Sequence, residues 1–244
     1  MWLTSSSIGR KVVMSVTGAA LVLFLLFHGT MNLVAVFSET GFNTIASFLG
    51  TNAVVQFMVP ILALLVVLHF VFAIILTLQN KKARGTDRYA VVGKSPVEWQ
   101  AKNMFVLGLI VILGLVLHLI NFWTKMQLQE WMGNAPEAGF TLIKELFAQP
   151  LYVVLYLIWF AGIWFHLSHG IWSAMQTLGW NNRTWFRRWH VIGIILATIV
   201  VLIFAFVAVA FYLHSLGMWD SVGHIWTLGQ HAAPEAVEVI PIQL

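Results

Sequence analysis

The sequence predicts an all-α integral membrane protein with five transmembrane helices. Of its 244 residues, 60% are hydrophobic and only 9% are charged, which is not the composition of a soluble domain. Five apolar segments are each long enough to cross a bilayer as a helix, and polar stretches separate them. The chain has no cysteine. This excludes disulfides, cysteine-ligated iron–sulfur clusters and covalently attached haem.

The expected spans and their connections follow in chain order. The N-terminal stretch MWLTSSSIGRKV lacks a small-residue cleavage site before a short apolar core, so no removable signal peptide is expected. Segment 37–52 is short and polar and is expected to lie along the membrane interface, while GNAPEAGF within 124–149 is typical of a loop. The membrane domain is predicted over residues 1–214, with spans at about 12–36, 53–78, 103–123, 150–177 and 189–214, followed by an extracytoplasmic tail, 215–244, on the membrane surface.

Lysine and arginine gather at one end of these spans. Only Lys125 and Lys144 of the 13 basic residues fall on the opposite side. The positive-inside rule therefore predicts a cytoplasmic N-terminus and an external C-terminus. The net charge of +4 is a topology signal and not a nucleic-acid footprint. The other eleven are Arg10, Lys11, Lys81, Lys82, Arg84, Arg88, Lys94, Lys102, Arg183, Arg187 and Arg188.

Each of the first four spans contains a histidine. They are His28, His69, His118 and His166, and the fourth span holds His169 as well. A polar group in hydrocarbon needs a partner, so an intramembrane histidine marks a functional site by default. A single one is equally well explained by a hydrogen bond to a neighbouring helix. One on each of four consecutive helices favours a function.

The depths of these histidines indicate a metal cofactor. At about 1.5 Å per residue, His28 and His118 lie roughly 24 and 22 Å from the cytoplasmic ends of their helices. His69 and His166 lie roughly 14 and 16 Å from theirs. The four histidines thus form an outer and an inner level. Two imidazoles facing each other at one level can ligate a haem iron from both sides, so two levels predict two haems in a four-helix bundle.

Two questions about the histidines stay open: the role of the glycines near them, and which histidine of the fourth span is the ligand. Gly114, Gly162 and Gly170 lie four residues from His118 or His166 and so share the helix face of the ligand. A missing side chain there leaves room for a porphyrin, and close helix–helix packing is the alternative. His166 and His169 differ in depth by only about 4.5 Å, so spacing and depth do not decide which of them is the ligand.

Three motifs resemble the cytochrome b subunit of succinate:quinone oxidoreductases, the succinate dehydrogenases and fumarate reductases with one five-helix anchor and two haems b. They are FHLSHGIWSAMQTLGW in the fourth span, HGTMN in the first and FNTIASFL after it. The resemblance covers about residues 5 to 214. It is most specific at His28 and Asn32 (H-x-x-x-N) and in the fourth span (F-H-x-S-x-G-x-W-S). The second and third spans match mainly by a histidine at the expected place.

The resemblance implies His28, His69, His118 and His166 as axial ligands and selects His166 over His169, which is implied to lie beside the haem. It pairs His28 with His118 for the outer haem and His69 with His166 for the inner one. Asn32 lies one turn from His28 toward the outer face, where it could hydrogen-bond quinone or a haem propionate, and a helix–helix hydrogen bond is an equally good explanation.

The resemblance also implies the setting of the protein. The expected location is the inner membrane of a bacterium, as a multi-pass protein. The implied partners are a flavoprotein subunit and an iron–sulfur subunit on the cytoplasmic side, and the complex can form a higher oligomer. The implied electron acceptor or donor is a quinone, usually menaquinone, and the dicarboxylate chemistry belongs to the partners.

Several further residues are weaker candidates. Glu39, Phe42 and Asn43 are placed to line a quinone pocket near the outer haem, although solvent exposure explains Glu39 more simply. His190 and His214 are expected at the membrane interface. His224 and His231 lack further ligands for a metal site, and most tryptophans are expected in interfacial belts.

Two other functions compete with the resemblance. One is a di-haem cytochrome b of a hydrogenase or formate dehydrogenase, whose motif pattern is not seen in this sequence. The other is a proton-coupled transporter with histidine relays. No Asp or Glu lies inside any predicted span, which counts against the transporter and makes a side-chain proton route doubtful.

Overall fold

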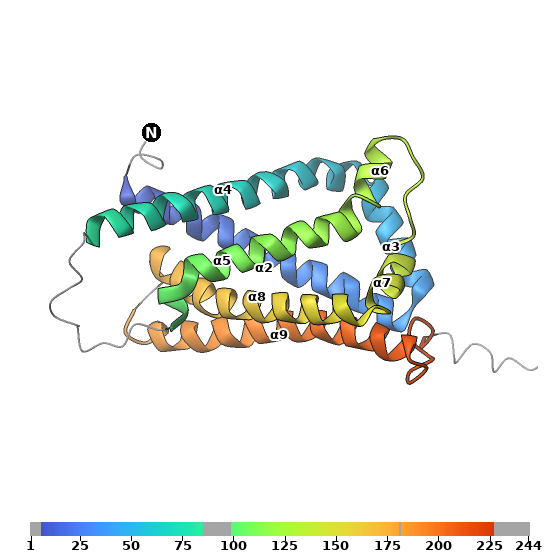
Figure 1. Ribbon diagram of the computed structural model, residues 1–244. Helices are drawn as coiled ribbons and strands as arrows, with labels where there is room; N and C mark the ends of the chain where they lie inside the picture. The colour runs from blue at the N-terminus through green and yellow to red at the C-terminus, as the bar shows by residue number, and fades with distance from the viewer. Residues whose placement is uncertain (1–5, 85–98, 181, 227–244) are drawn as a thin grey trace, which may run out of the picture.

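All five predicted spans are helices in the computed structural model, which describes residues 6–84, 99–180 and 182–226. They are α2 (Ser7–Phe37), α4 (Ala53–Arg84), α5 (Trp99–His118), α8 (Pro150–Thr177) and α9 (Trp185–Ser215) (Figure 1). A π-helix, η1 (Leu119–Trp123), continues α5 and completes its span. The described residues contain no strand, and the predicted all-α membrane fold is confirmed.

The helix ends follow from their capping residues. The Ser6 hydroxyl accepts the backbone N–H of Gly9 and begins α2. Asn52 accepts the N–H groups of Val54 and Val55 in the first turn of α4. Pro150 occupies the first position of α8, where its missing N–H costs nothing. The fourth span therefore has its predicted bounds, while the other helices run past the apolar stretch into polar residues.

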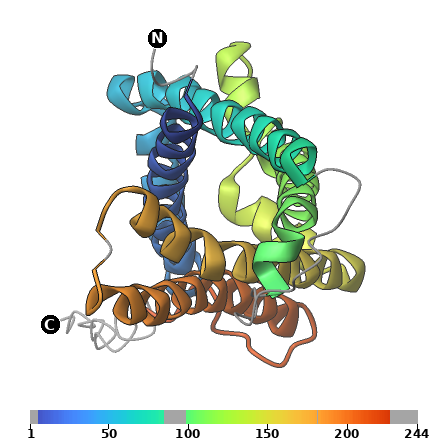
Figure 2. The same ribbon diagram turned by 90° about the vertical axis from the view of Figure 1, so that its left-hand side faces the viewer.

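Four helices surround a common axis, and the fifth packs outside them. Viewed along the bundle, α2, α4, α5 and α8 form a ring in which each helix contacts the next (Figure 2). Helix α9 packs against α8 and α2 on the outside of this ring. At Gly193 a side chain would lie 3.4 Å from the backbone oxygen of Ser168, so the small residue permits the close approach of α8 and α9.

The segments at the outer end contain more helix than the sequence indicates. Segment 37–52 forms α3 (Glu39–Thr51), which Ser38 caps by accepting the N–H of Gly41. Segment 124–149 is not a simple loop, because α6 (Gln127–Trp131) and α7 (Gly139–Phe147) lie within it. Helix α7 buries Phe140, Leu142, Ile143 and Phe147 against the bundle. Apolar residues at this helical spacing explain why α7 forms despite the turn residues before it.

The beginning of the predicted tail packs onto the bundle. Gly223 donates its N–H to the carbonyl of Val36 (2.8 Å) and accepts the N–H of Glu39 (2.7 Å). Val222 is fully buried. Residues 216–226 therefore contact α2 and α3, and the expected domain boundary at 214 stays a prediction. Residues 227–244, with His231, are outside the described residues.

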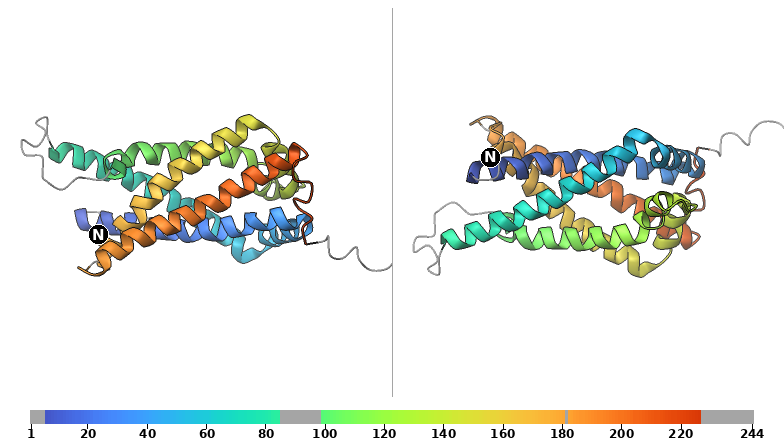
Figure 3. Two further views of the ribbon diagram at one scale, coloured as in Figure 1. Left: turned by 90° about the horizontal axis from the view of Figure 1, so that it is seen from below. Right: turned by 90° about the horizontal axis from the view of Figure 1, so that it is seen from above.

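The basic side chains lie at one end of the bundle. The N-termini of α2, α5 and α9 and the C-termini of α4 and α8 meet at this end, whereas α3, α6, α7 and residues 216–226 lie at the other (Figures 1 and 3). This places Arg10, Lys82, Lys102 and Arg187 opposite Lys125, as the charge pattern predicts. Arg88 and Lys94 fall outside the described residues.

Candidate functional site

The outer pair of histidines joins α2 to the end of α5. The ring centroids of His28 and His118 are 5.8 Å apart, and the ring planes cross at 84°. Aromatic side chains surround both imidazoles: Phe24 stacks on His28 at 5.3 Å, and Phe122 lies 5.1 Å from His118. An apolar, aromatic enclosure of this kind suits a flat hydrophobic cofactor.

The inner pair joins α4 to α8. The ring centroids of His69 and His166 are 6.2 Å apart, with the planes at 70°. Both pairs are thus formed by helices that are not neighbours along the chain. They are the same two pairs that the depths of the residues indicate.

Thr17 of α2 fixes the orientation of the His69 ring. Its hydroxyl oxygen is 3.2 Å from Nδ1 of His69. The same hydroxyl donates its single proton to the carbonyls of Val13 (2.8 Å) and Met14 (3.1 Å). A hydroxyl that donates to the backbone accepts from the imidazole, and in that arrangement Nδ1 of His69 carries the proton and Nε2 keeps its lone pair. This is the tautomer that binds a metal through Nε2.

One ring nitrogen of His166, the Nδ1 atom, is buried without a hydrogen bond among the described residues. Gly108 of α5 faces this ring, since a Cβ added there would lie 3.7 Å from Cε1 of His166. A Cβ added at Gly18 of α2 would likewise lie 3.1 Å from Cε1 of His69. A glycine therefore lies against each of the two inner rings.

The separation of the two rings in each pair is that of two imidazoles on either side of an iron, and it also lies within the range of ordinary aromatic contacts. Metal–imidazole bonds are about 2 Å long, so a metal held between two imidazoles separates the ring centroids by about 6 Å. The observed separations are 5.8 and 6.2 Å. No group of three or more metal-ligating side chains occurs among the described residues, so each pair would need further ligands from the cofactor itself. A haem supplies four such ligands from its porphyrin nitrogens.

A π-helix follows directly after His118. The N–H of Thr124 donates to the carbonyl of Leu119, and the wider turn is η1. Asn121 in this turn donates to the hydroxyl of Tyr156 on α8 at 3.1 Å. Single π-turns in helices are frequent at functional sites, and this one anchors the end of α5 beside the outer pair.

The glycines near the candidate ligands pack helices together. A side chain at Gly114 would collide with the indole of Trp159, whose Nε1 donates to the carbonyl of Val111. Ile110 fills the space at Gly162, where a Cβ would lie 2.7 Å from its methyl group, and Met104 lies against Gly170. The helix-packing alternative therefore describes Gly114, Gly162 and Gly170, while Gly18 and Gly108 are the glycines that face the imidazoles.

Asn32 and His169 lie beside the histidine pairs. The amide nitrogen of Asn32 donates to the backbone carbonyl of His28 (2.8 Å) and lies 3.3 Å from Nε2 of the same residue. Asn32 thus contacts the candidate ligand one turn away, and not a neighbouring helix. The ring of His169 packs on Trp172 at 5.4 Å, and His166 is the residue that faces His69.

The weaker outer candidates connect segments of the fold. Phe42 is buried against Gly139 of α7, and the side-chain oxygen of Asn43 accepts the N–H of Phe140 at 3.1 Å. The carboxylate of Glu39 lies 3.9 Å from Nε2 of His224. These contacts join α3 to α7 and to residues 216–226.

Sequence reasoning missed Thr17 and Gly18 of α2. Neither residue is unusual in a membrane helix, where small and hydroxyl side chains are common. Their roles become visible only when α2 and α4 are placed side by side. The one signal in the sequence is their position about three turns from His28 on the same helix, at the inner level.

The comparisons with known proteins add no relative. The chain matches no protein-family model, no curated protein and no solved structure. Function is therefore argued from the residues and their geometry.

Proposed function

We propose that this protein is the di-haem cytochrome b membrane anchor of a succinate dehydrogenase or fumarate reductase. The observation that carries the proposal is the presence of two histidine pairs at two depths, each with the ring separation of a doubly ligated iron. The motifs around His28 and His166 favour this family over other di-haem cytochromes b.

The chain's residues would hold the two haems and set their properties. When bound, each haem b supplies a reversible one-electron couple. His69 and His166 would ligate the inner iron, and His28 and His118 the outer one. Thr17 keeps His69 in the binding tautomer, and the aromatic residues around His28 and His118 exclude water. Exclusion of water and hydrogen bonds to the ligand are the means by which a protein adjusts a haem potential.

Electrons would enter at the level of His69 and His166. The basic end of the bundle is nearer to this pair and is the proposed docking surface for the iron–sulfur subunit, with the flavoprotein beyond it. Quinone exchange, with menaquinone as the expected quinone, would take place near the outer pair, around Asn32 and α3. Transfer outward moves negative charge away from the negative side of the membrane. A membrane potential assists it by about 2.3 kcal/mol per charge per 100 mV for a full crossing.

Identifying the electron donor that reduces the haems tests this function. In membranes of the native organism, succinate should produce the b-type absorbance of a reduced-minus-oxidised spectrum, and fumarate should reverse it. Reduction by hydrogen or by formate, with no response to succinate, would assign the chain to a hydrogenase or a formate dehydrogenase. A purified chain without any b-type absorbance would contradict both assignments. The proton-coupled transporter would then be the remaining candidate function.

A further inference from the structure

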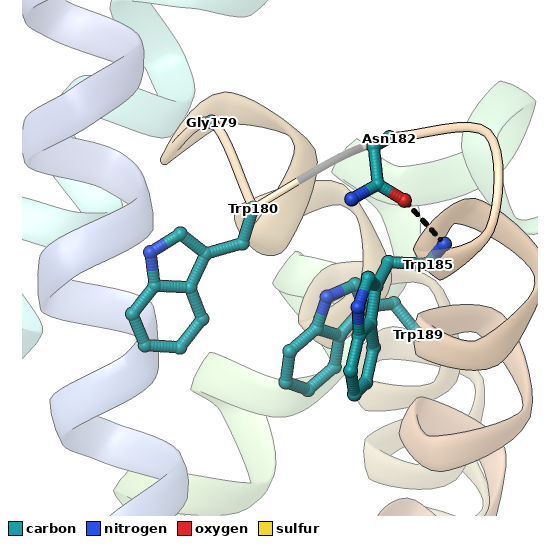
Figure 4. A pocket seen from close by; sticks show the side chains of 5 residues that line it. All are labelled: Gly179, Trp180, Asn182, Trp185 and Trp189. Atoms are coloured by element: carbon teal, nitrogen blue, oxygen red, sulfur yellow. Dashed lines mark hydrogen bonds between the residues drawn. The ribbon is translucent and has the colours of Figure 1, made fainter.

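A groove with arginines and tryptophan lies where α9 begins. It has a volume of about 570 Å³ and is lined by Thr184, Trp185, Arg187, Arg188, Val191 and Ile192. A second cavity, of about 310 Å³, shares Trp185 with this groove and is lined by the neighbouring indoles of Trp185 and Trp189 (Figure 4). The site therefore combines positive charge, aromatic rings and aliphatic side chains at the end of a transmembrane helix.

Within the part of the chain that the structure describes, no acid balances the positive charge of this groove. The sequence holds no Asp or Glu between Glu145 and Asp220. Among the described residues, no carboxylate lies within ion-pair distance of Arg187 or Arg188. The guanidinium of Arg188 lies 5.2 Å from the ring centre of Trp185, an interaction that leaves its N–H donors available. An anion would complete this site.

The backbone at the start of α9 is already satisfied. The side-chain oxygen of Asn182 accepts the N–H groups of Thr184 (3.0 Å) and Trp185 (2.9 Å), and its backbone carbonyl accepts that of Phe186. Recognition of an anion therefore falls to the arginine side chains and not to the helix terminus.

An apolar stripe runs from the arginines toward the middle of the bilayer. Val191, Ile195 and Ile199 follow Arg187 at intervals of four residues, so they lie on one face of α9. Their side chains are 49%, 52% and 45% exposed. From Arg187 to Ile199 the helix rises about 18 Å, which is close to half the thickness of a bilayer. This face therefore has a positive charge at its end and exposed apolar side chains over a length that corresponds to one leaflet of the bilayer.

We propose that this face of α9 binds an anionic phospholipid of the same leaflet. Arg187 and Arg188 would contact the phosphate, Trp185 would lie at the headgroup level, and one acyl chain would lie along Val191, Ile195 and Ile199. A water-soluble acidic protein could reach the arginines but not the stripe. The continuity of charge and stripe on one helix face therefore selects a lipid.

Spin-label measurements on the full-length protein test the lipid site directly. The protein is reconstituted in phosphatidylcholine vesicles with a trace of phosphatidylglycerol or phosphatidylcholine that carries a label on its acyl chain. The wild type should retain phosphatidylglycerol several-fold more strongly than phosphatidylcholine. R187Q/R188Q should lose this preference, because each arginine near the membrane surface contributes to the attraction of an anionic lipid. R187K/R188K should keep most of it.

The matched control is K81Q/K82Q, which removes two exposed charges from the end of α4 at the same end of the bundle. It should leave the preference unchanged. Equal losses in the two double variants would show a general surface charge and overturn the site. Absence of any preference in the wild type would also overturn it and would leave the arginines for an acidic protein partner. Displacement of the labelled lipid by glycerol 3-phosphate would show a site for soluble phosphates instead.

Discussion

At the scale of single residues, the inner pair shows how a membrane helix holds a histidine in one state. The Thr17 hydroxyl lies 3.2 Å from Nδ1 of His69 and can donate its own proton to the backbone, which favours a proton on Nδ1. The contact therefore favours one of the two tautomers. It also holds the ring at a fixed angle opposite His166 before any metal binds.

Replacing Thr17 with Val should weaken binding of the inner haem about 10- to 100-fold, because an outer hydrogen bond to a metal-ligating histidine is lost. The outer haem should be unaffected. Haem titration of the cofactor-free protein measures both affinities. The control is Thr30→Val on the same helix, where the hydroxyl is exposed and bonds only to the carbonyl of Leu26. Equal affinities in wild type and Thr17→Val would refute the role of Thr17.

The two histidines of the fourth span should behave differently when each is replaced. His166→Ala should lose one haem equivalent, because His166 faces His69. His169→Ala should retain both haems, since its ring packs on Trp172. Haem content per chain after purification distinguishes them. Loss of one equivalent in His169→Ala, with retention in His166→Ala, would reverse the assignment.

Residue type and depth were sufficient to predict the two levels at which histidines meet, whereas the choice of His166 over His169 came from the resemblance. Each span is a rigid rod of known rise, so a position in the sequence becomes a height in the membrane. The partners of the histidines could not be predicted in this way. Thr17, Trp159 and Gly108 reach the site through the rotation of each helix about its axis, which depends on packing against neighbours.

At the scale of whole elements, the long helices were predictable and the short ones were not. A transmembrane helix is recognisable from length and apolar composition alone. Helices α3 and α7 are polar on one side and form because their apolar side packs on the bundle, which requires the tertiary fold. Gly133 and Pro136 favoured a loop in the sequence, and in the structure they lie before the first residue of α7.

The contact of residues 216–226 with α2 and α3 gives a prediction for Gly223. This residue has a φ of +86°, and a Cβ there would lie 2.6 Å from the ring of Phe140. Gly223→Ala should combine backbone strain with overpacking, each about 1–3 kcal/mol, and lower the melting temperature. Gly217 has a φ of +69° with nothing near its Cβ position, so Gly217→Ala should show the strain alone. Equal melting temperatures for the two variants would contradict the packed position of Gly223.

At the scale of the whole molecule, the charge asymmetry predicts the orientation of the bundle. The chain has no cysteine, so single cysteines can be introduced without a background. In intact cells, a membrane-impermeant thiol reagent should label Met218→Cys, which lies at the end opposite the basic residues and is 71% exposed. Lys82→Cys should be labelled only after the membrane is permeabilised. The reverse pattern would show that the positive-inside rule fails for this chain.

The order of the helices around the bundle axis could not be predicted from the sequence. Helix α9 is as apolar as the four helices of the ring, and only the histidines of the first four spans predicted that these four form the bundle and the fifth is added to it. Its place outside α8 and α2 follows from the small residues on its buried face, among them Gly193 and Ala197. Only α2, α4, α5 and α8 therefore bring a histidine to the interior.

The central claim is that two histidine pairs at two depths hold two haems. The most direct measurement is the haem content of double variants, because single losses do not reveal pairing. The wild type should contain two haems per chain, and His28→Ala/His118→Ala should keep one, since both ligands serve the same iron. His28→Ala/His69→Ala should keep none. One haem in each double variant, or none in both, would contradict the pairing, and a wild type without haem would contradict the claim itself.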